Sequence, residues 1–322
     1  NIDRLAARGT LFRAAYCPAP LCNPSRAALL TGVPPHVSGV YTNNQDWRPR
    51  LTETVALPSY FRRHGYRTIG AGKLFHDAFR DDGIWDEYFH GGHSAQPPFA
   101  EQPVCGLELA AHFDWGPVDR GVGALRDWRV ASYACEALAA ERDAPLFLGV
   151  GFYRPHLPWY VPQEFFDLNP LQSIHLPALE EADLADVPPA ARALVDARTH
   201  ETITGGGRWE AAIQAYLASV EFADRCVGRL LDALDAAPRR ENTIVVLWSD
   251  HGWHFGEKGH WRKSTLWEEA TRVPLVVVVP GLTQPGSVCD EAVSLMDLYP
   301  TLVELCGLPA RGEIAGASLV PL

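Results

Sequence analysis

The chain has 322 residues, of which 47% are hydrophobic and 21% charged, so it is long enough for one large α/β domain or two ordinary ones and has the composition of a globular protein. Its net charge of −11 argues against nucleic acid as a partner, because binding to phosphates requires a basic face. No apolar run approaches the roughly 20 residues of a membrane helix. Seven cysteines without paired motif spacing argue against a full disulfide framework.

Two helices are predicted near the start of the chain. Residues 1–9 carry apolar side chains at helical spacing and end in Gly9, a typical helix stop. Residues 22–32 read CNPSRAALLTG. Pro24 suits the beginning of a helix because its ring fixes φ and it has no N–H to leave unpaired, and Gly32 is placed to end that helix.

The second of these helices carries a candidate reactive group. Cys22 lies just ahead of it, where free backbone N–H groups and the helix dipole favour negative charge. Arg26, four residues later, can lie on the same face and present a fixed cation. The pattern predicts a site for an anionic ester with a modifiable nucleophile at its centre. The alternative is a buried cysteine before an ordinary capped helix.

The rest of the chain alternates apolar strands with amphipathic helices. A helix is expected over 209–236, where apolar residues recur at three- and four-residue spacing. This alternation predicts an α/β fold with a mostly parallel central sheet flanked by helices. The expected strands, read as buried on both faces, are Tyr66–Ala71, Leu146–Phe152, Thr243–Trp248 and Leu275–Val279.

Polar side chains follow three of these strands. Ligands bind beyond the carboxyl ends of strands in such sheets, and Lys73, His156 and Asp250 fall there. His156 lies between prolines, which suits a positioned general acid, although a loop histidine with a structural hydrogen bond is as common. Lys73 is followed three residues later by His76, and the alternative for that pair is a surface lysine with a packing histidine.

A second group of candidates lies after the strand that ends at Trp248. Asp250 and His251 place a carboxylate beside an imidazole, which fits a cation site, although an aspartate at a strand end often only caps the following turn. Lys263 lies beyond a loop expected to fold over the same edge. The chain has three lysines (Lys73, Lys258 and Lys263) among 28 basic residues, which suggests that lysine is kept where a compact ammonium is needed. Chance is the alternative.

Together, these motifs resemble those of a known enzyme family. C-x-P-S-R followed by A-x-L-L-T-G resembles the signature of type I sulfatases. Four further elements, in the same order as here, are similar to those of iduronate-2-sulfatase-like sulfatases: Gly72–His76, Pro155–Pro158, Ser249–Trp253 and Gly256–Lys263. The resemblance implies an alkaline-phosphatase-like fold and hydrolysis of the sulfate ester of a sulfated carbohydrate, and it favours a periplasmic or secreted location.

The resemblance also implies roles for particular residues. In this family the cysteine is oxidised to formylglycine by a formylglycine-generating enzyme, and its hydrated aldehyde attacks sulfur. The arginine holds this group, two lysines bind sulfate oxygens, and two histidines orient the nucleophile or protonate the leaving oxygen. The matching catalytic set is Cys22, Arg26, Lys73, His76, His156 and Lys263.

The metal site departs from the family pattern. The resemblance implies that Cys22, Asp250 and His251 bind one divalent ion, calcium in most relatives. Two further ligands come from an Asp-Asp pair on a first strand that precedes the segment beginning at Asn1, and Asp3 is no substitute. Calcium takes roughly six to eight oxygen ligands, so tight binding by this chain is not expected.

We expect residues 1–322 to form one large N-terminal sulfatase domain, truncated at both ends, with long surface excursions over 91–106 and 171–208. Two alternatives remain for its activity. One is a phosphonate or phosphate monoester hydrolase, since relatives with that activity use the same C-x-P-x-R element. The other is a catalytically inactive sulfatase-like fragment.

Overall fold

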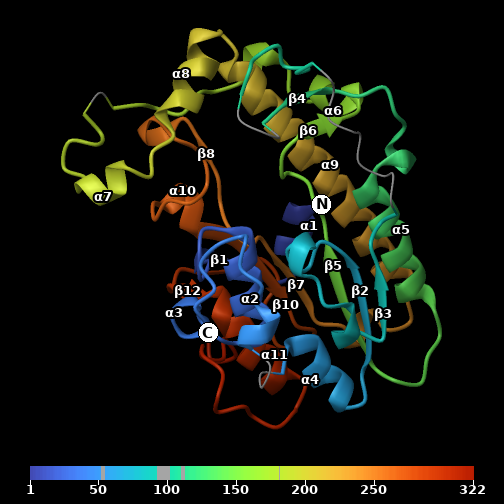
Figure 1. The fold of residues 1–322 in the computed structure, drawn as a ribbon. Helices are drawn as coiled ribbons and strands as arrows, with labels where there is room; N and C mark the ends of the chain where they lie inside the picture. The colour runs from blue at the N-terminus through green and yellow to red at the C-terminus, as the bar shows by residue number, and fades with distance from the viewer. Residues whose placement is uncertain (52–54, 93–101, 110–112, 181) are drawn as a thin grey trace.

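The structure is a computed structural model that describes residues 1–51, 55–92, 102–109, 113–180 and 182–322. Its strands form two principal sheets with helices around them (Figure 1). The larger sheet has the order β11 (Ser287–Cys289), β1 (Thr10–Tyr16), β10 (Arg272–Val278) and β7 (Val245–Trp248), with β12 (Val293–Ser294) also paired to β1. The smaller sheet has the order β3 (Glu87–Phe89), β2 (Arg67–Gly72) and β5 (Leu146–Gly151).

The α/β class is confirmed, and the larger sheet is mixed. β2 is parallel to β3 and β5, and β1 is parallel to β11 and β12, whereas β10 runs antiparallel to both β1 and β7. The reversal has a local cause. After β7 the chain stays at the edge where β7 ends, through the hairpin β8 (His254–Phe255) and β9 (Trp261–Arg262) and the helix α10 (Glu268–Thr271). β10 therefore enters the sheet from that edge.

β10 is buried on both faces, as its apolar sequence predicts. Leu275 and Val277 belong to the main core, whereas Val276 packs on the other face with Leu5 and Leu231. The main core contains side chains of α2 (Cys22–Thr31), α4 (Leu57–Arg63) and α11 (Leu298–Leu305). The other face is covered by α1 (Ile2–Ala6) and α9 (Trp209–Ala236). The alternation follows from the period of two residues in a strand.

β5 and β7 are less buried than their sequences predict. Within the described ranges each pairs with one neighbour only, β5 with β2 and β7 with β10. Residues 146–150 and 245–248 are consequently half-buried, although nearly all are apolar. The expectation of full burial was wrong for these two strands, because it assumes a neighbour at both edges.

An aromatic core lies beside the second sheet, under α9 and α5 (Arg126–Ala139). It includes Phe113, Trp115, Trp159 and Trp261 in edge-to-face or tilted contacts. The short strands β4 (Trp115–Pro117) and β6 (Trp159–Val161) pair in parallel there, followed by α6 (Gln163–Asp167). Among the helices of the described ranges, none combines the length and hydropathy needed to cross a membrane. All seven cysteines are free thiols.

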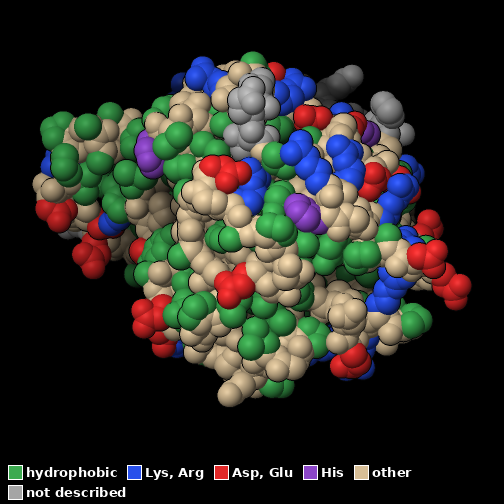
Figure 2. Space-filling model, turned by 90° about the horizontal axis from the view of Figure 1, so that it is seen from below, with side chains coloured by type: hydrophobic (Ala, Val, Ile, Leu, Met, Phe, Trp, Pro, Cys, Tyr) green, Lys and Arg blue, Asp and Glu red, His purple; other side chains and the backbone are tan. Residues whose placement is uncertain are grey.

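Residues 175–180 and 182–196 form a lobe that stands away from the sheets, at the left of Figure 1. The lobe contains α7 (Pro189–Arg192) and leads into α8 (Ala197–Gly205). The short helix α3 (Pro35–Ser38) follows α2 in the chain and is not part of the lobe. Hydrophobic side chains gather on the lobe, at the left of Figure 2. Its exposed leucines are Leu176, Leu179 and Leu194. Most of the other expected excursion, residues 93–101, lies outside the described residues.

Candidate active site

Side chains from five segments meet where β2, β5 and β7 end. Each segment follows a strand or begins a helix, so backbone hydrogen bonds fix its starting point. The structure brings together most of the residues singled out from the sequence. They are Cys22 at the start of α2, Lys73 after β2, His156 after β5, Asp250 and His251 after β7, and Lys263 after β9.

Cys22 is the first residue of α2, whereas the sequence predicted that it would lie just ahead of the helix. Leu21 is the N-cap, with φ −158° and ψ 140°, and Gly32 ends the helix with φ 73° as predicted. All ten residues of α2 are buried, so the helix is held on every side. The Asn23 N–H is already bonded to Asn43 Oδ1 at 2.9 Å. The charge at Cys22 is therefore set mainly by neighbouring side chains.

Two ammonium groups and an imidazole lie close to the Cys22 sulfur. Lys263 Nζ lies 2.9 Å from Sγ and Lys73 Nζ 3.8 Å, and His251 Nε2 is at 3.3 Å. Burial alone would raise the pKa of Cys22, but Lys73 and Lys263 more than offset it and bring that pKa well below its ordinary value. By contrast, burial raises the pKa of Cys17 to about 12. The site around Cys22 is built to hold negative charge.

Arg26 faces Asp250 rather than the Cys22 sulfur. Its Nε donates to Asp250 Oδ2 at 2.6 Å, and its Nη1 donates to the carbonyl oxygens of Lys73 and Leu74 at 2.5 and 3.1 Å. Burial would raise the pKa of Asp250, but the Arg26 guanidinium holds it well below its usual value. The expected contact from Arg26 to Cys22 is thus replaced, because the planar fork of donors suits the buried carboxylate and the two carbonyls.

Cys22, Asp250 and His251 form a possible metal cluster. One ligand atom from each lies within 4.8 Å of the others. His251 Nδ1 donates to the Gly252 carbonyl at 2.8 Å, which leaves the lone pair of Nε2 directed at the cluster, the usual arrangement of a ligating histidine. No other such group of His, Cys, Asp or Glu occurs among the residues described. The three donors suit a divalent ion but supply fewer than the roughly six to eight ligands that calcium takes.

His156 faces Cys22, whereas His76 lies further out. The pKa of Cys22 is further lowered by a hydrogen bond with His156. His156 Nδ1 donates to the Leu157 carbonyl at 2.7 Å, so Nε2 is the ring atom available to the site. Burial, followed by Lys73 and Lys263, lowers the pKa of His156 to about 4, so its ring is neutral near pH 7. His76 is half-buried, and burial lowers its pKa as well.

Tyr153 is a site residue that the sequence did not identify. Its ring lies 5.5 Å from Lys73 Nζ and 3.8 Å from the Arg126 guanidinium, and its hydroxyl donates to Asp77. Burial lowers the pKa of Lys73, and an aromatic face is one of the few neighbours that can stabilise an ammonium there. An aromatic residue directly after an apolar strand was the available signal.

Asp127 was also missed, and it holds the loop that carries His156. This buried carboxylate accepts hydrogen bonds from the backbone N–H groups of Tyr153 and Arg154 at 2.9 and 2.8 Å. Arg154 in turn donates to the His156 carbonyl at 3.3 Å and to the Tyr160 carbonyl at 3.2 Å. Asp127 lies in the first turn of α5, where an acidic residue is common, so its position in the sequence carries no sign of this role.

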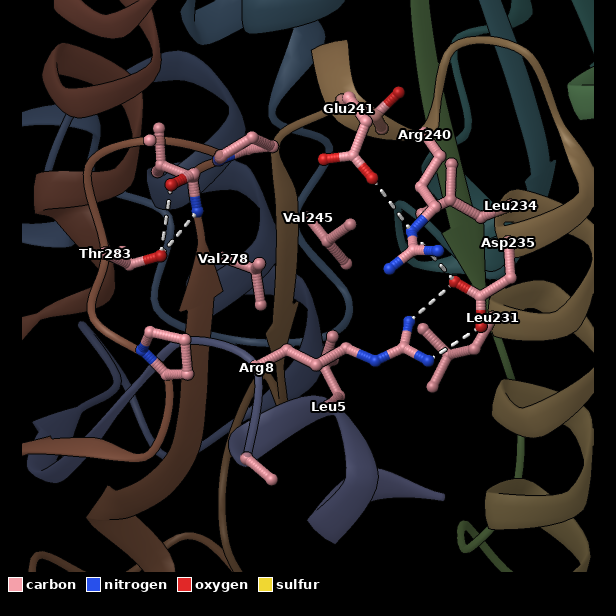
Figure 3. A pocket seen from close by; sticks show the side chains of 16 residues that line it. Leu5, Arg8, Leu231, Leu234, Asp235, Arg240, Glu241, Val245, Val278 and Thr283 are labelled. Carbon is pink, nitrogen blue, oxygen red and sulfur yellow. Dashed lines mark hydrogen bonds and ion pairs between the residues drawn. The ribbon is translucent and has the colours of Figure 1, made fainter.

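A separate pocket lies away from these residues. A pocket of about 330 Å³ opens at the amino end of β7, lined by α1, α9 and the end of β10 (Figure 3). Arg8 donates to both carboxylate oxygens of Asp235, at 2.8 and 2.7 Å, and Arg240 lies between Asp235 and Glu241. Its charges are mutually paired, and its lining includes no histidine or cysteine. The chemistry therefore belongs to the opposite end of β7.

Comparison with known proteins identifies relatives over nearly the whole chain. The family model described as Sulfatase matches residues 1–308. A sulfatase from Formosa agariphila is 41% identical over 342 residues, covering 99% of this chain and 66% of that protein. Human iduronate 2-sulfatase is 32% identical, covering 96% of this chain and 64% of that protein. The chain thus spans slightly less than two thirds of the length of these relatives.

Solved structures share the fold. The phosphonate monoester hydrolase SpPMH from Silicibacter pomeroyi has a TM-score of 0.78 at 20% identity, over 99% of this chain and 70% of that one. BT4656, in complex with its substrate D-glucosamine-2-N,6-O-disulfate, has a TM-score of 0.75 at 22% identity, over 99% of this chain and 74% of that one. At these identities the likeness concerns the fold.

Replacing Asp127 by alanine should destabilise the protein. Two buried N–H groups lose their acceptor, and an unsatisfied buried group costs about 1–3 kcal/mol. Urea unfolding should give a free energy of unfolding at least about 2 kcal/mol below that of the parent. Alanine at the exposed Asp119 is the control and should change it by less than about 0.5 kcal/mol. Equal values for the two variants would show that Asp127 does not hold the loop.

Proposed function

The chain belongs to the sulfatase family, and we propose that it hydrolyses the sulfate ester of a sulfated carbohydrate with Cys22 as the precursor of a formylglycine nucleophile. The observation that carries the proposal is the Cys22 sulfur at a helix start, with the Lys263 and Lys73 ammonium groups at 2.9 and 3.8 Å. Relatives named iduronate 2-sulfatase and delta 4,5-hexuronate-2-O-sulfatase support a carbohydrate substrate. The alkaline-phosphatase-like fold is that of the sulfatases and phosphonate monoester hydrolases above.

In the unmodified chain, the Cys22 sulfur stands in for the oxygens of the modified residue. Oxidation to formylglycine by a formylglycine-generating enzyme would supply a hydrated aldehyde, a nucleophile that sulfatases use. Lys73 and Lys263 would bind the non-bridging sulfate oxygens and stabilise the negative charge that develops on them. Arg26 would fix the carboxylate of Asp250 and, through the carbonyls of Lys73 and Leu74, the position of the Lys73 segment.

His156 is the residue best placed to hold or move a proton. Its Nε2 faces the reacting position because Nδ1 is fixed on the Leu157 carbonyl. The two lysines contribute to the low pKa of His156, and an anionic ester bound between them would offset their charge. The bound ester would thus raise the pKa of His156, so that Nε2 can take up a proton and give it to the departing alkoxide oxygen. We assign His76, half-buried beside the same cations, an orienting role.

We further propose that the divalent ion is calcium, held by Cys22, Asp250 and His251. An ion there would act as a Lewis acid toward a sulfate oxygen. The missing oxygen ligands need a further segment. β5 and β7 both end at the cluster and both have an unpaired edge among the described strands. A strand paired with them, ending in the acidic pair typical of the family, would bring two carboxylates there.

Mass spectrometry and turnover together test the proposed function. Co-expression with a formylglycine-generating enzyme should convert Cys22 to the aldehyde in the peptide of residues 14–26, and aryl sulfates should be hydrolysed. Cys22→Ala should remove turnover with little effect on folding. Faster hydrolysis of aryl phosphonates or phosphates would favour that activity instead. An unmodified thiol at full occupancy in an active preparation would contradict the nucleophile.

The two lysines near the sulfur should each be needed for catalysis. Lys73→Ala or Lys263→Ala should lower kcat/KM by about a hundredfold or more, because removing one stabilising group from developing charge costs about 3–4 kcal/mol. Lys258→Ala is the matched control, since its ammonium bonds Asp183 at 2.5 Å. Steady-state kinetics on an aryl sulfate measures the effect. Equal losses in all three variants would refute the assignment.

Calcium should bind residues 1–322 only weakly, because three donors leave the coordination shell incomplete. We expect calorimetry to give a dissociation constant of about 1 mM or weaker, the range of weak protein sites. Calcium should therefore raise the melting temperature only at high concentration. Asp250→Ala should remove the response. Tight binding to residues 1–322 would mean that other groups complete the site.

A further inference from the structure

The backbone on both sides of Lys263 has an unfavourable conformation. The residues on either side of it, Arg262 and Ser264, have φ values of 76° and 78°. L-residues rarely adopt positive φ, and such residues persist only where their surroundings fix them. The strained segment carries the ammonium group that lies 2.9 Å from both Cys22 Sγ and His251 Nε2. Some contact must therefore stabilise this conformation.

His260 makes such a contact. Its side chain is buried, and its Nε2 lies 3.0 Å from the Lys263 carbonyl oxygen. Its Nδ1 lies 2.9 Å from the backbone nitrogen of Asp196. A backbone N–H can only donate, so Nδ1 is the acceptor and Nε2 carries the proton donated to Lys263. Burial lowers the pKa of His260, which agrees with a neutral ring.

The second partner of His260 belongs to a different part of the fold. Asp196 is the N-cap of α8 and the last residue of the lobe of residues 175–180 and 182–196, and its side chain accepts from Thr199. His260 itself lies in the loop between β8 and β9. One imidazole therefore joins the lobe to the segment of the catalytic lysine, and both of its nitrogens are satisfied.

We propose that His260 is a positioning residue, whose hydrogen bond to the Lys263 carbonyl holds the Lys263 ammonium against the reacting position. Its effect on turnover rests on the proposed sulfatase function, whereas its effect on the place of Lys263 does not. A misplacement of about 1 Å can cost about a hundredfold in rate. His260 acts only through Lys263, since no contact joins it to Cys22 among the described interactions.

Two amide variants separate the partners of His260. The side-chain nitrogen of Gln reaches the place of Nε2, so His260→Gln keeps the bond to Lys263. The side-chain oxygen of Asn reaches the place of Nδ1, so His260→Asn keeps only the bond to Asp196. His254→Gln is the matched control, because this buried histidine packs on His260 at 4.9 Å and bonds Thr265, not Lys263.

The three lysines allow a readout that does not need activity. Protein labelled at lysine Cε gives three carbon signals, for Lys73, Lys258 and Lys263, and Lys263→Arg assigns one of them. His260→Asn should shift the Lys263 signal and leave the other two in place. His260→Gln and His254→Gln should leave all three in place. An unmoved Lys263 signal in His260→Asn would overturn the proposal.

Kinetics then tests the consequence for catalysis. On an aryl sulfate, kcat should fall by at least about tenfold in His260→Asn and by less than about threefold in His260→Gln and His254→Gln. Melting temperatures separate this loss from unfolding. If His260→Gln loses as much as His260→Asn, the bond to Lys263 is not what matters and the proposal fails. If the parent protein turns over no sulfate ester, the proposed function fails, while the lysine signals still decide the role of His260.

Discussion

The buried contact between Arg26 and Asp250 is the interaction on which the site depends. One guanidinium ties the helix that begins at Cys22 to the end of β7 through a carboxylate, and to the end of β2 through the carbonyls of Lys73 and Leu74. Removing one partner of a buried ion pair typically costs about 3–5 kcal/mol, because the other charge is left without compensation. The positions of the nucleophile, one lysine and one metal ligand are thus linked through a single side chain.

The local charge of the site opposes the charge of the whole protein. The chain carries a net charge of −11, yet Lys73 and Lys263 lie within hydrogen-bonding distance of one sulfur atom. An anion approaching from solvent meets a repulsive field that salt screens over about 10 Å. Close to Cys22 the two ammonium groups dominate, since burial reduces the screening. Recognition of the anion therefore depends on short-range contacts rather than on long-range attraction.

Local sequence predicted the elements well and the partners of the side chains poorly. The helix over 209–236 and the stop at Gly32 are confirmed, because periodicity and glycine conformation are local properties. The contact of Arg26 with Asp250 and the role of Asp127 depend on segments that meet only in the folded chain. The direction of β10 was missed for the same reason, since its apolar residues do not indicate from which edge the chain enters the sheet.

The half-buried strands β5 and β7 have a consequence for handling residues 1–322 in isolation. Among the strands that the structure describes, neither has a partner along one edge, where it presents a row of unpaired backbone groups flanked by apolar side chains. Such edges are templates for pairing with strands of other molecules, and natural proteins usually blunt them with charges, prolines or bulges. Neither Leu146–Gly151 nor Val245–Trp248 contains a charged residue or a proline. Residues 1–322 in isolation should therefore self-associate through these two edges unless another strand pairs with them.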